Sequence, residues 1–481
     1  MTAFGIDVGT TSVKGLALGE RGEILARAEV PHPTSTPHPG WSEQDPEDWW
    51  AGAQQVLGEL ESAAGRPAGI GLSGQMHGLV ALDAQNRVVR PALLWNDQRT
   101  ATEAAEIDDL LGGPEGVAAA TGNAALTGFT APKLRWLARH EPDAHARVRS
   151  VLLPKDHVRL RLCGEHATDV TDASGTLWFD VRERRWSPAV LSALGVDAAW
   201  LPPALESPAV SATTAAGVPV AAGAGDQAAG ALGAGITRPG PVSVVLGTSG
   251  VVLRALDGYA ADPRSGLQAS AHAVPATWFA MGVILSAAGS LRWLRDALDA
   301  PYDVLLAEAA RWPPGCDGLT FLPHLTGERT PHPDPGARGA FAGLEIRHDR
   351  GALVRAVLEG VAFALRDALD LVAALGGAVD VGRVSGGGAR SELWLKICAA
   401  VLELPLERAV ADEGAARGAA LLGGVAGGVW GSVPEAVAAC MPPAVPIEPE
   451  PSWVGAYAAQ RGRYRALYPA LRDLPAGTGR P

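Results

Sequence analysis

An internal repeat constrains the fold of this chain more than any other feature. One copy has short apolar runs at residues 3–8 and 13–18, joined by a turn that begins Gly9-Thr10. The other copy, at residues 242–253, repeats this design around Gly247-Thr248, nearly half of the 481-residue chain further on. Each copy is typical of a β-hairpin, and a repeat of this length predicts two similar α/β domains.

Both hairpin turns suit phosphate oxygens. The first turn contains Gly9, Thr10 and Thr11, and the second contains Gly247 and Thr248. Such turns offer backbone N–H groups and hydroxyls to an anion. Neither turn is a Walker A loop, because the pattern G-x-x-x-x-G-K-[ST] is absent from the chain. By analogy with actin, hexokinase and the heat-shock ATPases, two such hairpins facing across a cleft would hold a triphosphate from both sides.

A third glycine-rich turn lies in the second half of the chain. A strand is predicted at residues 379–384, and a helix is predicted to begin at about Glu392. Between them lies the sequence Ser-Gly-Gly-Gly-Ala-Arg-Ser, which includes Gly387, Gly388 and Ala389. A strand, a glycine-rich turn and a helix N-terminus form an arrangement that receives anions or nucleotides.

The acid Asp226 follows the apolar run 218–220 and a glycine-rich turn, and small residues of helical character come after it. Glycine lets backbone approach a ligand closely, so this carboxylate could take a substrate proton. A plain strand–helix corner with a capping aspartate is the alternative. The segment from Gly223 also fits the dinucleotide pattern G-x-G-x-x-A. Against that interpretation, the acid would repel a pyrophosphate, and no Asp or Glu stands about 20 residues further on.

The loop after the predicted strand 69–72 contains the pair Met76-His77 between glycines. Open α/β sheets bind ligands at the carboxyl ends of their strands, where this loop is expected. An imidazole can hydrogen-bond a sugar hydroxyl, and methionine provides a soft apolar wall. A histidine with a purely structural role is the alternative.

Composition limits the classes of partner. The net charge of −12 argues against nucleic acid or an anionic membrane. A bound nucleotide would need Mg²⁺, backbone N–H groups or a few local cations. The four cysteines show no C-x-x-C or zinc spacing, which favours a reducing compartment. With no signal-peptide pattern and no apolar run long enough for a bilayer, we expect a soluble cytoplasmic protein.

An ordered set of short motifs resembles the FGGY carbohydrate kinases along nearly the whole chain. The motifs are Gly5–Thr10, Trp41–Pro46, Gly74–Gly78, Leu94–Asp97, Gly128–Leu134, Leu153–Asp156, Leu246–Gly250, Gly327–His332, Arg355–Gly360 and Gly386–Arg390. The Gln-Met-His-Gly loop points, within this family, to the D-xylulose-phosphorylating branch rather than to the branches acting on glycerol or ribulose.

The resemblance implies two duplicated actin-like (ribonuclease H-like) domains that close an interdomain cleft on ATP and D-xylulose. It implies that Asp226 is the general base, that Met76 and His77 bind the sugar together with Asp226, and that Asp7 serves the Mg²⁺–phosphate region. It places Gly388 and Ala389 against the nucleotide. We expect Asp226 to be ionised near its unperturbed pKa of about 3.9.

The domain boundary is expected at the Pro- and Gly-rich stretch 237–241. Residues 1–236 would form an N-terminal sugar-binding domain, and residues 237–481 a C-terminal nucleotide-binding domain. A homodimer is compatible with the sequence.

Two departures from the family pattern concern the site. Gln227 follows the base where relatives usually carry Asn, and Glu392 stands where some relatives carry Asn near the adenine. The alternatives are therefore a kinase for another pentulose or polyol on the same fold and, from a different class, a non-catalytic actin-like ATPase.

Overall fold

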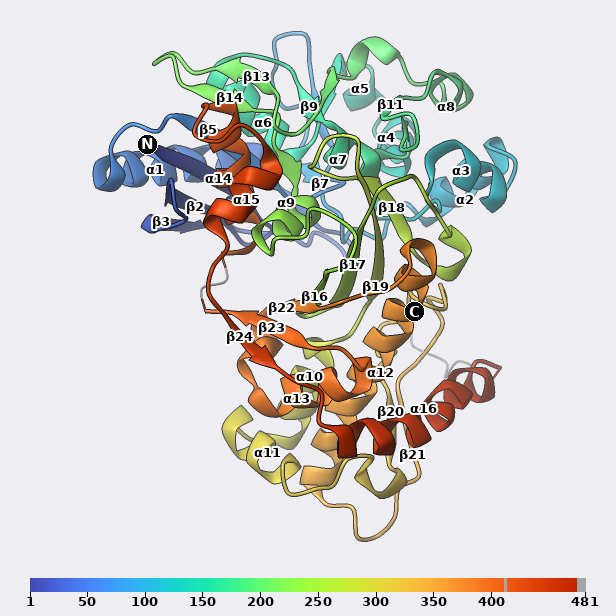
Figure 1. Ribbon diagram of the computed structural model, residues 1–481. Coiled ribbons are helices and arrows are strands. Elements are labelled where there is room, and N and C mark those ends of the chain that lie inside the picture. The colour runs from blue at the N-terminus through green and yellow to red at the C-terminus, as the bar shows by residue number, and fades with distance from the viewer. Residues whose placement is uncertain (411–412, 474–481) are drawn as a thin grey trace.

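Two seven-stranded sheets form the frame of the computed structural model, which describes residues 1–410 and 413–473 (Figure 1). The first sheet has the order β13-β14-β5-β1-β2-β3, with β15 beside β5. Its strands are β1 (Thr2–Val8), β2 (Ser12–Gly19), β3 (Ile24–Pro31), β5 (Gly69–Gly74), β13 (Val210–Thr213), β14 (Pro219–Ala221) and β15 (Ala224–Gly225).

The second sheet has the order β18-β19-β17-β16-β22-β23-β24 and lies below the first in Figure 1. Its strands are β16 (Val242–Leu246), β17 (Gly250–Leu256), β18 (Gln268–Ala271), β19 (Trp278–Ile284), β22 (Gly382–Ser385), β23 (Leu406–Ala409) and β24 (Ala444–Ile447).

The two sheets repeat one topology. The hairpin β1–β2 corresponds to the hairpin β16–β17, and the first strand of each runs parallel to a third strand, β5 or β22. A further parallel strand and then an antiparallel one extend both sheets in the same direction, as β14 and β13 in the first and β23 and β24 in the second. The predicted duplicated α/β fold is confirmed.

The remaining elements cover the sheets or link their strands. The helices are α1 (Pro46–Ala64), α2 (Ala101–Leu110), α3 (Pro114–Thr121), α4 (Thr130–His140), α5 (Pro142–His145), α6 (Pro154–Cys163), α7 (Val170–Ala173), α8 (Pro188–Leu194), α9 (Asp226–Gly233), α10 (Ala288–Leu298), α11 (Tyr302–Ala309), α12 (Arg350–Gly376), α13 (Glu392–Leu402), α14 (Gly414–Ala426), α15 (Val433–Cys440) and α16 (Pro451–Leu471), with 3₁₀ turns η1 (Ser174–Thr176), η2 (Ala198–Trp200), η3 (Pro263–Ser265), η4 (Cys316–Gly318) and η5 (Gly387–Arg390). The minor strands are β4 (Glu43–Gln44), β6 (Val80–Leu82), β7 (Ala92–Leu93), β8 (Ser150–Leu152), β9 (Thr168–Asp169), β10 (Phe179–Asp180), β11 (Arg185–Trp186), β12 (Ala204–Leu205), β20 (Thr320–Leu322) and β21 (Ala340–Ala342).

Local sequence explains where the two main covering helices begin. The Asp45 side chain accepts a hydrogen bond from the N–H of Glu47 at 3.0 Å, and Pro46 occupies the first turn of α1. Asp349 caps α12 in the same way, through the N–H of Ala352. The sequence predicts a helix over about 351–375 with Gly360 in its middle, where a glycine indicates close packing, and this packing is confirmed because a Cβ there would collide with backbone of β20.

The helix α14 comes late in the chain but packs on β1 and β5 of the first sheet and on α9. Its small residues allow this contact, since a Cβ at Gly71 of β5 would collide with the Ala419 carbonyl. On the other side of α9, Leu232 shares a buried cluster with Val251 and Met281 of the second sheet. The division at residues 236 and 237 therefore stays a prediction, while α14 clearly serves the first sheet.

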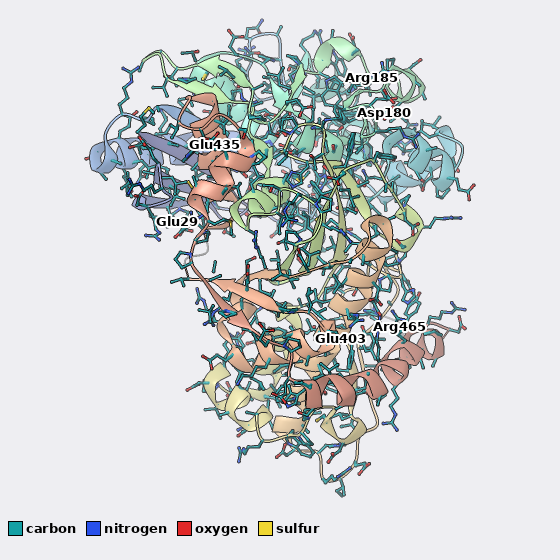
Figure 2. The ribbon with its side chains drawn as sticks, viewed as in Figure 1. Glu29, Asp180, Arg185, Glu403, Glu435 and Arg465 are labelled. Atoms are coloured by element: carbon teal, nitrogen blue, oxygen red, sulfur yellow. The ribbon has the colours of Figure 1, made fainter. Side chains whose placement is uncertain are left out.

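Two predicted boundaries were wrong. The strand predicted at 379–384 is β22, which spans Gly382–Ser385. It begins three residues later than predicted and ends one residue later. The sequence also predicts a last helix from Trp453 to Tyr468 that stops before Pro469, but α16 spans Pro451–Leu471 and includes this proline. A proline so close to a helix end removes little hydrogen bonding. Ion pairs from Arg465 to Asp367 and Asp370 of α12, at 2.6 and 3.0 Å, hold this end of α16 in place (Figure 2).

Two smaller expectations concern cysteines and membranes. All four cysteines are free thiols, in agreement with the absence of paired spacings. Among the described residues, no helix combines the length and the apolar character that a bilayer crossing requires.

Candidate active site

Three parallel strand ends bring the two predicted catalytic acids to one edge of the first sheet. Asp7 of β1 lies opposite Ser73 of β5, and Ser73 lies opposite Ala224 of β15. Asp226 follows β15 directly and begins α9. Both carboxylates therefore lie at the carboxyl ends of the two strands that flank β5, where open α/β sheets bind ligands.

The environment of Asp226 changes its acidity. Burial raises the pKa of this carboxyl to about 7, and the charge of Asp7 contributes to the increase. The Gln227 amide donates a hydrogen bond to Oδ1 of Asp226 at 3.4 Å, and this bond offsets part of the increase in pKa. The expectation of an ordinary pKa was wrong, because the sequence does not reveal that the two acids share a desolvated site. Burial also raises the pKa of Asp7, against the charge of Lys14.

The sugar-loop pair lies beside the same turn. Met76 is buried, and a Cβ at Gly225 would come within 2.7 Å of its Cγ atom. Only glycine at the residue before Asp226 allows this contact. The half-buried His77 packs against Phe129, with 4.7 Å between the ring centroids. The fold thus brings Met76 and His77 to the turn that carries Asp226.

His77 is neutral and has a defined tautomer. Burial lowers its pKa to about 3, and the charges of Lys133 and Arg329 contribute. Its Nδ1 atom lies 2.7 Å from the Gly175 carbonyl oxygen. Because a carbonyl can only accept, Nδ1 carries the proton and Nε2 presents a lone pair. No described residue donates to Nε2, so this atom can accept a hydrogen bond from a sugar hydroxyl.

The backbone of His77 is held in the left-handed region, with φ of 68°. Its carbonyl accepts hydrogen bonds from Lys133 Nζ at 2.8 Å and from Thr130 Oγ1 at 3.2 Å. Burial lowers the pKa of Lys133 to about 7. Both residues belong to the motif at Gly128–Leu134, but their role in supporting the sugar loop could not be seen without the fold.

Polar side chains hold the turn between β1 and β2, which contains Thr10. Gln44 donates to the Thr10 carbonyl at 2.6 Å, and Trp95 donates to the Thr10 hydroxyl at 3.1 Å. Gly9 closes the turn onto the Ser12 carbonyl at 3.1 Å. The backbone N–H groups of Thr10 and Thr11 have no partner among the described residues, so they can donate to a phosphate.

The second hairpin is supported by the start of α10. The Thr248 carbonyl accepts from the N–H groups of Ala287 and Gly289, at 2.8 and 3.0 Å. A Cβ at Gly386 would come within 2.8 Å of the Leu246 backbone, so the triple-glycine turn lies directly against the hairpin. The structure therefore brings together the predicted nucleotide residues of this domain, which are Gly247, Thr248, Gly387, Gly388 and Ala389.

Cavities connect the two domains at these turns. A cavity of about 790 Å³ is lined by Lys14 of the first sheet and by the turn 385–390 of the second. A second cavity of about 380 Å³ is lined by Asp7, Lys14 and Glu29. Lys14 was missed in the sequence, although the register of the hairpin, which pairs it with Asp7, could have identified it. Glu392 is exposed at the start of α13.

Two protein-family models and several known proteins match this chain along most of its length. The model of the FGGY family of carbohydrate kinases, N-terminal domain, matches residues 2–233, and that of the C-terminal domain matches residues 242–427. The chain is 41% identical to the xylulose kinase of Escherichia coli K12, covering 98% of this chain and 100% of that protein. It is 34% identical to the xylulose kinase of Bacillus subtilis 168, covering 98% and 97%.

Solved structures agree. A "xyloylose kinase" from Brucella ovis has a TM-score of 0.93 and 43% identity, covering 98% of this chain and 99% of that chain. The Plasmodium falciparum glycerol kinase with ADP has a TM-score of 0.88 at 20% identity, covering 98% of both chains, and so shares the fold.

Proposed function

The chain belongs to the FGGY family of carbohydrate kinases, and we propose that it uses ATP to phosphorylate D-xylulose to D-xylulose 5-phosphate. The observation that carries this proposal is Asp226, a carboxylate with a pKa of about 7 on a turn that Met76 covers and that Asp7 adjoins. Xylulose kinases that are 33–41% identical over 98% of the chain support the choice of sugar.

In the proposed reaction, a primary hydroxyl of the sugar attacks the γ-phosphorus of ATP. The hydroxyl oxygen forms the new P–O bond, the bond to the β,γ-bridging oxygen breaks, and ADP leaves with that electron pair. Asp226 accepts the hydroxyl proton. Met76 and the Nε2 atom of His77 orient the sugar, which is the main requirement of a transfer that involves little covalent chemistry by the protein.

The turns of both domains would stabilise the negative charge of the phosphates. The N–H groups of Thr10 and Thr11 approach from the first domain, and Gly247, Thr248 and η5 approach from the second. Preorganised donors of this kind stabilise charge that develops in the transition state. Lys14 adds a cation at the cavity that joins the domains.

The residues around Asp7 fit a magnesium ion. Oδ1 of Asp7 is buried without a hydrogen-bond partner among the described residues, and Asp7 lines the 380 Å³ cavity. In the described part of the chain, no group of three or more His, Cys, Asp or Glu could hold a metal. This suits Mg²⁺, which commonly binds one or two carboxylates, waters and substrate phosphates. Asp7 would hold the ion, directly or through water, and Mg²⁺ would offset phosphate charge.

We place this reaction in the cytoplasm, because four free cysteines favour a reducing compartment. A homodimer stays a prediction that analytical ultracentrifugation would test.

A substrate panel tests the proposed function. ADP release would be measured with Mg-ATP and D-xylulose, L-xylulose, D-ribulose, L-ribulose, glycerol or no sugar. We expect the highest kcat/KM with D-xylulose and little ADP without sugar. A stronger signal with another substrate would retain the kinase chemistry and point to Gln227 and the Met76-His77 loop as the source of altered specificity. ADP release at the same rate with and without sugar would favour the ATPase alternative.

The raised pKa of Asp226 predicts the pH profile. The base must be ionised to accept a proton, and its pKa is about 7. Below this pH, kcat/KM for D-xylulose should fall by about tenfold per pH unit, and above it the rate should level off. The profile would be measured in buffers of constant ionic strength. An acidic limb near pH 4, with full activity at pH 5.5, would show that Asp226 titrates as an ordinary carboxyl.

A further inference from the structure

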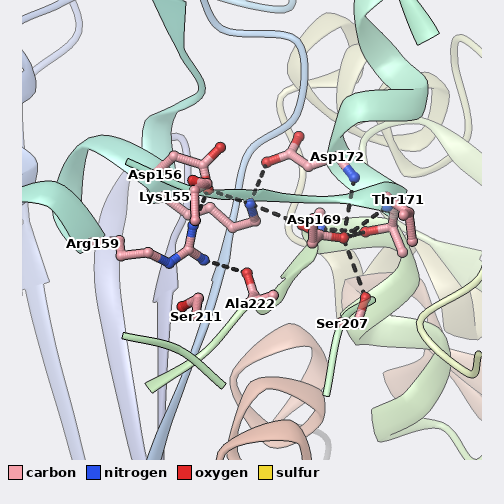
Figure 3. Close-up of polar contacts among 12 residues, drawn as sticks. Lys155, Asp156, Arg159, Asp169, Thr171, Asp172, Ser207, Ser211 and Ala222 are labelled. Carbon is pink, nitrogen blue, oxygen red and sulfur yellow. Dashed lines mark hydrogen bonds and ion pairs between the residues drawn. The ribbon is translucent and has the colours of Figure 1, made fainter. Parts of the chain in front are cut away.

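A cluster of five buried charged side chains contacts the segment that leads into Asp226, through Ala222 (Figure 3). Its members are Lys155, Asp156, Arg159, Asp169 and Asp172. Lys155 Nζ lies 2.6 Å from Asp156, 2.9 Å from Asp169 and 3.2 Å from Asp172, and Arg159 lies 2.7 Å from Asp156. None of these groups touches the cavities between the domains, so the proposed chemistry does not account for them.

The cluster is connected to the backbone of the base turn at two points: Arg159 donates to the Ala222 carbonyl, and a hydroxyl holds the residue just before Asp226. Oδ2 of Asp169 accepts hydrogen bonds from the Thr171 N–H at 2.7 Å and from Thr171 Oγ1 at 2.6 Å. The same hydroxyl accepts a hydrogen bond from the N–H of Gly225 at 2.9 Å. Gly225 is the residue before Asp226 and caps α9. Thr171 therefore links the charged cluster to the peptide unit next to the base.

The short distance from Thr171 to Asp169 is typical of a charge-assisted O–H···O⁻ bond, which is roughly twice as strong as a neutral one. Ser207 Oγ donates to the same Asp169 oxygen at 3.2 Å. Asp169 is in turn held by Lys155. These contacts fix Asp169, and Asp169 fixes the Thr171 hydroxyl that accepts the Gly225 N–H. The hydroxyl therefore cannot move without breaking buried hydrogen bonds.

We infer that Thr171 is a positioning residue for phosphoryl transfer, because its hydroxyl fixes Gly225 and so aims the carboxylate of Asp226. This inference rests on the proposed function. Met76 packs against the α-carbon of Gly225, and Thr171 holds its N–H group. A shift of about 1 Å in a catalytic group can cost on the order of 10²-fold in rate, so losing one of these two restraints should lower kcat.

The test compares three threonine variants. Thr171→Val keeps the shape of the side chain but removes the hydroxyl, and kcat should fall by about tenfold or more while KM for ATP stays within about twofold. Thr171→Ser restores the hydroxyl and should recover at least half of the wild-type kcat, which a purely steric role would not predict. Thr168→Val is the matched control, since the Thr168 hydroxyl is buried without a partner in the described part of the chain, and kcat should not change.

Hydrogen exchange gives a readout that does not depend on activity. The peptide containing Gly225 should exchange faster in Thr171→Val than in wild type or Thr168→Val, because the amide has lost its acceptor. If Thr171→Val does not fold, Ser207→Ala removes a weaker donor to Asp169, and should lower kcat less and in the same direction.

Two outcomes would overturn the inference. One is a kcat for Thr171→Val within twofold of wild type, and the other is equal losses in Thr171→Val and Thr168→Val. Failure of the proposed function itself would look different, as wild-type ADP release that does not depend on D-xylulose.

Discussion

Replacing Asp226 with Asn should lower kcat for sugar phosphorylation on the order of 10²- to 10⁴-fold, with KM for ATP nearly unchanged. An amide of the same shape cannot accept the hydroxyl proton, and the described structure offers no second carboxylate on that turn. The variant should fold at least as well as wild type, because removing a buried acid relieves its repulsion with Asp7.

Steady-state ADP release with D-xylulose would measure this loss. Asp349→Asn is the matched control, since it makes the same chemical change at the N-cap of α12, where Asn also caps well. Its kcat should equal that of wild type. A kcat for Asp226→Asn within about threefold of wild type would remove the role of general base from this residue.

Replacing Lys155 with Met should destabilise the protein by about 3–5 kcal/mol, because it leaves buried carboxylates without their shared cation. Burial by itself would lower the pKa of Lys155, but Asp156, Asp169 and Asp172 raise it above its usual value. Burial raises the pKa of Asp172 well above its usual range, against the charge of Lys155. Among the described residues, Lys155 pairs with all three acids, whereas Arg159 pairs only with Asp156. Losing Lys155 therefore leaves Asp169 and Asp172 without a cation there.

Urea denaturation would measure the change in the free energy of unfolding of Lys155→Met. Lys396→Met makes the same substitution at an exposed site on α13 and should change stability by less than about 0.5 kcal/mol. The double variant Lys155→Met/Asp169→Asn should lose less free energy of unfolding than the sum of the two single losses, because the two residues form one ion pair. Additive effects would show that Lys155 and Asp169 are not coupled.

Much of the frame could be predicted because its signals are local. A Gly-Thr turn between apolar runs specifies a hairpin wherever it occurs, so the two copies revealed the duplication. Asp226 could be identified for the same reason, since a strand, a glycine-rich turn and a small-residue helix follow one another in the sequence. The placement of Met76 at a strand end also followed from its neighbours in the chain.

The support behind the site could not be predicted, because it depends on residues that meet only in the fold. Thr171 and Gly225 are distant in sequence, and no local pattern pairs a threonine with that amide. The pKa of Asp226 depends on burial and on Asp7, which comes from a different strand. The end of α16 was misjudged because Pro469 was treated as a stop, whereas ion pairs from Arg465 to α12 hold that last turn.

The return of α14 to the first sheet affects how the protein is made. The ribosome delivers the strands of this sheet through β15 early, but the helix that covers β1 and β5 arrives about 200 residues later. At 5–20 residues per second, that face waits roughly 10 to 40 s for its cover. This chain therefore cannot follow the usual order, in which an N-terminal domain folds before the next one is synthesised. Its first domain can mature only after α14 has been synthesised, because until then β1 and β5 lack the helix that buries them.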